Sequence, residues 1–219
     1  MELNSLNSMI NSNPFIIEVT GISGIGKTTF INNLEGKYIP YCSIKSRHKF
    51  FAFISFFLLK IVSIRQIIWM FNCSISSNHI SIIFKLNIFR NLLLKFIRFE
   101  AAFHASASLS RIVLVDEGVS HIPFLIQDSK NLDKNLDYFF TEFKAFLNQI
   151  SLVVIDNDIS DEVICNRLLL RGHKRLAGYS TKEFKLFIKN NRSTLNKIIN
   201  EESRFQKVST IKSLNARNL

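Results

Sequence analysis

The chain of 219 residues has only three cysteines, and their placement excludes two kinds of protein. Cys42, Cys73 and Cys165 are odd in number, lie far apart and form no C-x-x-C pair. They argue against a disulfide framework and against a zinc site. This usage of cysteine predicts a reducing, cytoplasmic compartment.

The first residues lack the order of a secretion signal, in which charged residues precede an apolar run. They are instead rich in Asn and Ser. We expect residues 1–14 to form a flexible arm. We expect residues 15–219 to form a single domain, because the chain is long enough for one α/β core but too short for two.

No acidic residue occurs between Glu35 and Glu100, although the whole chain has 17. The same stretch has ten of the 28 basic residues, which account for most of the net charge of +11. Such a segment could face a polyanion, an anionic lipid surface or a phosphorylated substrate, and charge alone does not choose among them. We interpret residues 45–110 as a helical, basic and apolar insertion.

Long uncharged runs are also missing. The segment from Phe50 to Phe71 is dense in Phe, Ile and Leu and has no single polar face, so it should be buried on most sides or in contact with lipid. Its longest uncharged run, Phe50 to Leu59, is shorter than the roughly 18 to 20 residues that span a bilayer. Lys60 would add about 3 kcal/mol to the cost of insertion. We therefore expect no transmembrane helix here.

Residues 86–99 have the pattern of a basic amphipathic helix. One side is apolar, and the other has Asn87, Arg90, Asn91, Lys95 and Arg98. Two interpretations stay open. In the first, the apolar stripe of the helix packs on the sheet and its basic face is solvated. In the second, the basic face docks on anionic lipid headgroups or receives an anionic substrate.

A phosphate-binding loop is the most specific motif present. It is the sequence G-x-x-G-x-G-K-T-T, formed by Gly21, Ile22, Ser23, Gly24, Ile25, Gly26, Lys27, Thr28 and Thr29. It follows a strand-like run and precedes a helix-like one, as the motif requires. Its glycines let the backbone amides turn toward a phosphate chain. All nine residues are candidate ATP contacts, with Lys27 on the β- and γ-phosphates and Thr28 on Mg²⁺.

Short runs rich in β-branched residues predict the strands of a parallel sheet. They are Phe15 to Thr20, Tyr38 to Ile44, Arg111 to Gly118, Ile150 to Ile155 and Phe205 to Ile211. We expect helices from about Ser160 to Arg171 and from about Thr181 to Asn200. The alternation predicts an α/β fold of the P-loop NTPase type, with a doubly wound, mostly parallel sheet of about five strands and helices on both faces.

The third of these runs ends in two carboxylates and a glycine. Asp116 is a candidate Mg²⁺ ligand, because the metal on a loop-bound nucleotide is held by the loop hydroxyl and by a carboxylate from a neighbouring strand. Glu117 is a candidate base or hydroxyl-orienting group for the phosphoryl acceptor. The alternatives are a turn residue for Asp116 and a side chain that points away for Glu117.

A second basic group lies near Gly172. Arg167 and Arg171 are four residues apart and should share one helix face. Basic residues in a last helical turn are also favoured by the helix dipole alone. The functional interpretation is a lid at residues 172–178, whose arginines, with Arg175 as an ATP contact, neutralise the moving phosphoryl group.

These motifs together resemble small P-loop kinases of the nucleoside and nucleotide type, with a thymidylate-kinase-like layout. The resemblance covers both ends of the chain and hardly touches residues 41–110. It implies that Lys27 and Thr28 bind the ATP phosphates and Mg²⁺, and that Arg167, Arg171 and Arg175 are lid arginines. Such kinases usually have an arginine where this chain has Glu117. The Asp-Glu-Gly sequence is similar to that of ATP-binding proteins from bacterial surface-polysaccharide pathways.

The sequence therefore predicts an ATP-dependent kinase that moves the γ-phosphoryl of Mg-ATP to a small acceptor, anionic or amphipathic, such as a nucleotide-like, sugar or lipid-linked molecule. The alternative is an ATP-binding switch or adaptor in peripheral contact with an anionic membrane at its inner face. A GTPase is disfavoured because no D-x-x-G follows the third run and no N-K-x-D is found. Nucleic acid is an unlikely partner because Phe, Ile and Leu interrupt the basic residues, and a homodimer stays open.

Overall fold

The computed structural model describes residues 16–34, 38–46, 49–50, 53, 62–78, 81–156, 159–170 and 180–211. The predicted arm at 1–14, the predicted lid at 172–178, Arg171 and Arg175 lie outside these residues. Most of the first half of the Phe50 to Phe71 segment does too.

The described strands form one five-stranded parallel sheet in the order β2-β3-β1-β4-β5. Their bounds are β1 Ile16–Thr20, β2 Ile39–Pro40, β3 Val113–Asp116, β4 Ile150–Ile155 and β5 Lys207–Ile211. β1 and β4 are buried along their whole length, as strands covered on both faces must be. The predicted parallel α/β sheet is confirmed.

The second strand is shorter than predicted. Tyr38 to Ile44 was expected to be extended, yet the sheet includes only Ile39 and Pro40, and a 3-10 turn η1 follows at Tyr41–Ser43. Proline has no amide hydrogen to donate, so it is tolerated at a sheet edge, which is where β2 lies.

The remaining described elements are helices and short 3-10 turns. They are α2 Lys27–Asn33, α4 Ile64–Ile75, α5 Ile82–Leu109, η2 Val119–His121, α6 Ile122–Ile126, α7 Leu132–Glu142, α8 Lys144–Leu147, α9 Asp161–Leu170, α10 Thr181–Asn200 and η4 Glu202–Arg204. Both α4 and α10 begin with a capping box, Ser63 with Gln66 and Ser180 with Glu183. These caps satisfy backbone amides that the first helical turn leaves unpaired.

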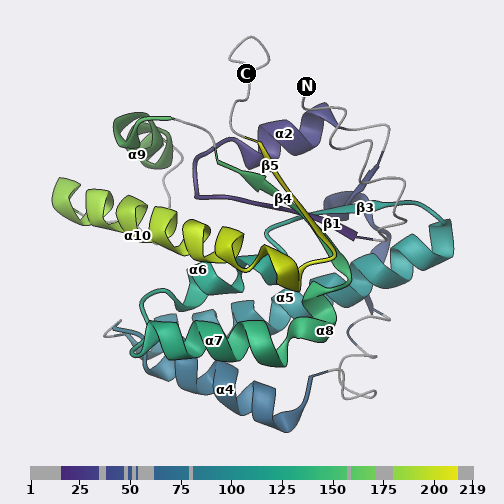
Figure 1. The fold of residues 1–219 in the computed structure, drawn as a ribbon, viewed down its shortest axis with the longest axis horizontal. Coiled ribbons are helices and arrows are strands. Elements are labelled where there is room, and N and C mark those ends of the chain that lie inside the picture. The colour runs from purple at the N-terminus through teal and green to yellow at the C-terminus, as the bar shows by residue number, and fades with distance from the viewer. Residues whose placement is uncertain are drawn as a thin grey trace.

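The strand order places helices on both faces of the sheet. The connection from β1 to β2 runs across the sheet in one direction and the connection from β2 to β3 returns in the other. Right-handed crossovers therefore put α2 on one face and α5 on the opposite face. Figure 1 shows this arrangement, with α2 above the strands and α5 beneath them.

The helix predicted at residues 86–99 is the middle of the much longer α5. Its apolar stripe enters the core, where Leu92, Phe96 and Phe99 are almost completely buried. Phe96 stacks on Phe143 with ring centroids 4.9 Å apart. Much of the expected insertion is thus packed against the sheet. Among the described helices, none is long and apolar enough to cross a membrane.

Candidate active site

The loop after β1 has the backbone shape of a phosphate cradle. Gly24 and Gly26 have φ angles of +85° and +112°, which side-chain-bearing residues rarely adopt. A Cβ at Gly21 would lie only 2.6 Å from the carbonyl oxygen of Ile155 at the end of β4. The glycines are therefore required both for the turn and for the close approach to the neighbouring strand.

Lys27 lies along this loop. Its side chain is 6% exposed, and its Nζ donates to the carbonyl oxygens of Gly21 at 2.9 Å and Ile22 at 3.1 Å. The same nitrogen forms an ion pair with Glu117 Oε1 at 3.2 Å. The ammonium group is thus held between the phosphate loop and the end of β3.

Asp116 and Glu117 meet the loop because β1 and β3 are neighbours. Val19 pairs with Asp116 in the parallel register, and the Glu117 amide donates to the Val19 carbonyl oxygen at 3.3 Å. Glu117 has a φ of +55°. A left-handed conformation at a non-glycine residue costs of order 1 kcal/mol or more and is concentrated at functional sites. The predicted convergence of both carboxylates with the loop is observed.

Glu117 is surrounded by basic side chains. His121 Nε2 lies 3.7 Å from its Oε2, on the opposite oxygen from Lys27. The positive charges of His121, Lys27 and Lys95 hold the pKa of Glu117 well below its usual range, although burial acts in the other direction. Glu117 is therefore a firmly ionised carboxylate.

Asp116 has the features of a metal ligand. Its Oδ1 is buried and has no hydrogen-bond partner among the described residues. Burial, and then the negative charge of Glu117, raise the pKa of Asp116. A buried carboxylate oxygen without a partner is costly unless a cation or donor binds it. Together with the exposed hydroxyl of Thr28, this oxygen fits the hard oxygen donor set of Mg²⁺.

Lys95 lies on the basic face for which two interpretations were left open, and at this residue the face is not solvated. Its side chain is 6% exposed, and its Nζ donates to the carbonyl oxygen of Glu117. Burial lowers the pKa of Lys95 to about 8, and Glu117 opposes the shift. The helix pattern placed Lys95 beside other polar residues, and only the docking of α5 against β3 shows that this position faces the site.

Glu18 is a second functional residue that sequence reasoning missed. It lies in the middle of β1, is fully buried and accepts hydrogen bonds from the amides of Val119 at 2.9 Å and Ser120 at 2.8 Å. Burial raises the pKa of Glu18, against the effect of these amides. Glu18 thus anchors the turn that positions Glu117 and His121. A single carboxylate inside an otherwise apolar strand was the available signal.

Of the three predicted lid arginines, only Arg167 lies in the part of the chain that the structure describes. Arg167 Nη1 donates to the Gly24 carbonyl oxygen at 3.3 Å, which places this guanidinium against the phosphate loop. Arg167 comes from α9, 143 residues away in the chain. Arg171 and Arg175 lie outside the described residues, so their predicted roles as lid arginines stay predictions.

A cavity of about 550 Å³ opens beside Glu117. Its walls come from the phosphate loop, the end of β3, η2 and the helices α5, α6 and α10. The residues that line it are Ser23, Phe84, Asn87, Ile88, Asn91, Leu94, Lys95, Arg98, Glu117, His121, Phe124, Leu125, Phe187 and Asn191. Four of its lining residues, Asn87, Asn91, Lys95 and Arg98, belong to the basic face for which a substrate-receiving role was left open.

A parallel sheet with this loop at the end of its central strand, and carboxylates at the end of the adjacent one, defines a P-loop NTPase domain. The KAP family P-loop domain matches residues 2–215, and the chain belongs to this family. No curated protein and no solved structure shows a significant match. The predicted P-loop NTPase domain is confirmed, and such a domain implies nucleotide binding. The thymidylate-kinase-like layout stays a prediction.

Proposed function

We propose that the protein transfers the γ-phosphoryl of Mg-ATP to a small acceptor that binds in the cavity beside Glu117. The observation that carries this proposal is the position of the cavity, whose lining includes both Ser23 of the phosphate loop and Glu117. Water needs no such chamber to reach a phosphate, whereas an acceptor of small-molecule size does. Cavities of this volume are typical of small-molecule sites.

Each part of the site has a role in this reaction. Lys27 and the loop amides bind the phosphates of ATP, and Arg167 stabilises the charge that spreads over the phosphoryl group in transfer. Thr28 and Asp116 hold Mg²⁺. When bound, the metal neutralises charge on the phosphates. Glu117 keeps Lys27 in place through their ion pair.

The test is transfer by the purified chain. Incubation with Mg-ATP and a mixed small-molecule extract should give a species that has gained one phosphoryl group, detected by mass spectrometry. Lys27→Ala should abolish the product, while Lys182→Ala, a change at an exposed lysine of α10, should leave it intact. ATP consumption with no phosphorylated species would refute the kinase proposal.

A second candidate is an ATP-dependent switch that binds an anionic membrane from the cytoplasmic side. Its support is an exposed apolar stripe on α4 that continues onto the first turns of α5, made up of Ile64, Ile68, Phe71, Ile75, Ile82, Ile83 and Leu86. Arg65, Lys85 and Arg90 lie on the same helices, in the part of the chain without acidic residues. Apolar area flanked by basic residues is what interfacial binding requires.

This candidate predicts co-sedimentation with vesicles that contain phosphatidylserine and weaker binding to neutral vesicles. Replacement of Ile68 by Glu should reduce the binding, and Glu at the exposed Leu186 of α10 should not. ATP hydrolysis that requires anionic vesicles and yields no other phosphorylated species would favour the switch over the kinase.

A further inference from the structure

We propose that the acceptor is an amphipathic phosphomonoester, with its phosphate held by Arg98 and Lys95 and its apolar body between α5 and α10. This inference rests on the proposed kinase function. It follows from how polar and apolar groups are distributed along the cavity.

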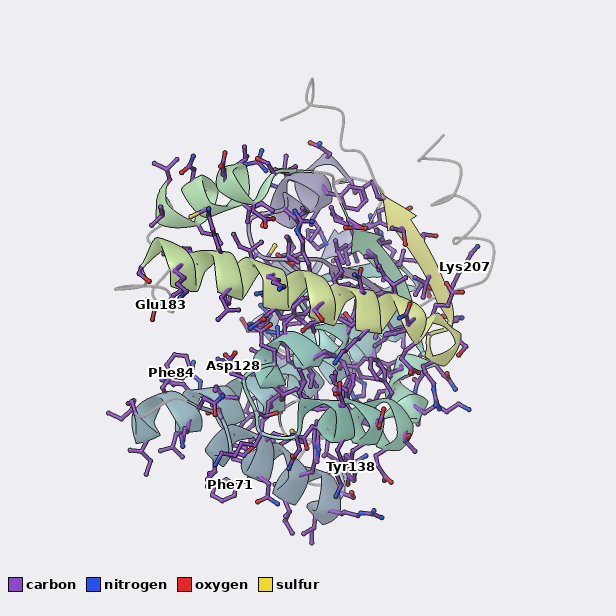
Figure 2. All side chains as sticks on the ribbon, turned by 60° about the vertical axis from the view of Figure 1, so that its left-hand side comes forward. Phe71, Phe84, Asp128, Tyr138, Glu183 and Lys207 are labelled. Atoms are coloured by element: carbon purple, nitrogen blue, oxygen red, sulfur yellow. The ribbon has the colours of Figure 1, made fainter. Side chains whose placement is uncertain are left out.

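The cavity follows one face of α5. Its lining residues on this helix recur at intervals of three or four, from Phe84 to Arg98, and so span about 21 Å. The opposite wall includes Phe187 and Asn191, one turn apart on α10. Figure 2 shows Phe84 near the start of α5 and Glu183 near the start of α10 on the same side of the molecule, with the cavity lined by both helices. The chamber therefore suits an elongated molecule.

One end of the chamber is charged and adjoins the phosphate loop. Lys95 marks this end, because its Nζ donates to the Glu117 carbonyl oxygen. Arg98 follows within one turn and lies over the ring of Tyr41, 6.0 Å from its centroid. The charged groups among the lining residues are Lys95, Arg98, Glu117 and His121. Since Glu117 already pairs with Lys27, Lys95 and Arg98 remain as excess positive charge.

The part of the lining that precedes Lys95 on α5 mixes apolar side chains with the amides of Asn87 and Asn91. Phe84 lies eleven residues before Lys95 on α5, which is about 16 Å away along the helix axis. Phe187 lines the chamber from α10 and Leu125 lines it from α6. Phe124 stacks on His121 with ring centroids 4.6 Å apart and therefore lies near the charged end. The amide of Asn191 is held in place by its hydrogen bond to the Phe187 carbonyl oxygen, at 2.7 Å. A molecule that fits this lining is anionic near the phosphate loop and has an apolar body with hydrogen-bonding groups beyond it.

The reaction chemistry favours a phosphate over a hydroxyl as the accepting group. Transfer to a hydroxyl requires a base, and both carboxylate oxygens of Glu117 already have partners, with Lys27 3.2 Å from Oε1 and His121 3.7 Å from Oε2. A phosphate oxygen is already anionic. It forms a bond to the γ-phosphorus while the bond from that phosphorus to the β–γ bridging oxygen breaks. ADP leaves with the electron pair, and no proton has to be removed.

The test uses 1-naphthyl phosphate as the probe and 1-naphthol as its uncharged counterpart. Binding to the full chain is measured by calorimetry with the phosphate loop saturated by a non-hydrolysable Mg-ATP analogue. We expect the phosphate to bind at least about tenfold more tightly than the naphthol, since charge-assisted pairs add of order 1.5–3 kcal/mol. Arg98→Met should remove most of this preference. Arg90→Met, at an exposed arginine of the same helix, should preserve it.

Equal binding of the two probes, no binding of the phosphate, or equal effects of the two arginine variants would overturn the inference. The product of the extract assay distinguishes a failure of the phosphomonoester inference from a failure of the proposed kinase function. A phosphoanhydride that diminishes in Arg98→Met supports both. A simple phosphate ester on a former hydroxyl keeps the kinase and refutes the phosphomonoester acceptor. No phosphorylated product refutes the kinase itself.

Discussion

Lys95 shows how a single buried charge ties the middle of the chain to the active site. Its ammonium group is buried and donates to the Glu117 carbonyl oxygen. It also interacts electrostatically with the carboxylates of Glu117, Glu18 and Asp116. Removal from water disfavours the charged form, and the nearby carboxylates only partly compensate. A lysine placed in this way connects α5 to the ends of β1 and β3.

The burial of Lys95 predicts a dependence of stability on pH. Its pKa is about 8 in the folded protein against 10.5 for the free side chain. Between these values the unfolded chain binds the proton and the folded chain does not, so stability rises with pH in this window. We expect the free energy of unfolding of the wild type to rise relative to Lys95→Met by about 1.4 kcal/mol per pH unit between pH 8 and 10. Urea denaturation at several pH values measures it.

The control is Lys182→Met, which removes an exposed lysine of α10. Its stability should follow the wild type at every pH. A wild-type curve parallel to that of Lys95→Met between pH 8 and 10 would show that Lys95 keeps its ordinary pKa in the folded protein.

Arg167 links α9 to the phosphate loop. Its guanidinium contacts the Gly24 carbonyl oxygen at 3.3 Å, so the loop that binds phosphates has a planar cation beside it. Arg167→Lys keeps the charge and loses the fork of donors. We expect ATP turnover to fall on the order of 10³-fold, the lower range for arginines that stabilise phosphoryl transfer. Steady-state kinetics would show it, and a loss below threefold would remove Arg167 from catalysis.

The matched change for this prediction is Arg204→Lys. Arg204 forms an ion pair with Glu201 at 3.2 Å, within the short turn before β5. Its replacement should leave turnover unchanged.

At the scale of elements, η2 depends on Glu18, a residue about 100 positions earlier in the chain. Glu18 in β1 accepts hydrogen bonds from the backbone amides of Val119 and Ser120. The carboxylate fits there because Gly118 has no side chain. A Cβ on Gly118 would lie 2.0 Å from Glu18 Oε1. As long as Glu18 is present, the turn therefore has no room for a side chain at position 118.

This fit predicts a strong coupling between Gly118 and Glu18. Gly118→Ala should displace the Glu18 carboxylate and destabilise the fold by about 3 kcal/mol, from steric overlap and lost hydrogen bonds. In a Glu18→Ala background the new methyl group has room, so the same change should cost less than about 1 kcal/mol. A double-mutant cycle by urea denaturation measures the difference. Additive effects would mean that the two residues do not share this contact.

Elements with strong local signals were predicted closely. The run from Ile150 to Ile155 is a strand and that from Thr181 to Asn200 is a helix, both with the expected bounds. A run of buried β-branched residues predicts a strand, and a capping serine predicts the start of a helix, from only a few neighbouring residues. The predicted bounds of β2 were wrong. Pro40 and the edge position limit this strand to two residues, and the edge position depends on the order of the strands in the sheet.

At the scale of the whole molecule, the phosphate loop and Asp116 with Glu117 could be placed together before the structure was known. Parallel strands bring their carboxyl ends to one edge, so two motifs at strand ends must meet. The cavity could not be predicted in the same way. Its walls join α5 to α10, segments about a hundred residues apart, and depend on how both dock on the sheet.

The central claim concerns the molecule as a unit, namely that a nucleotide at the loop and an acceptor in the cavity react with each other. The most direct measurement follows the γ-phosphoryl of labelled ATP, with Mg²⁺ and a mixed small-molecule extract, through the purified full chain. We expect the label to move to a small organic acceptor and Lys27→Ala to prevent the transfer. Label that appears only in inorganic phosphate, at the same rate with and without the extract, would contradict this claim.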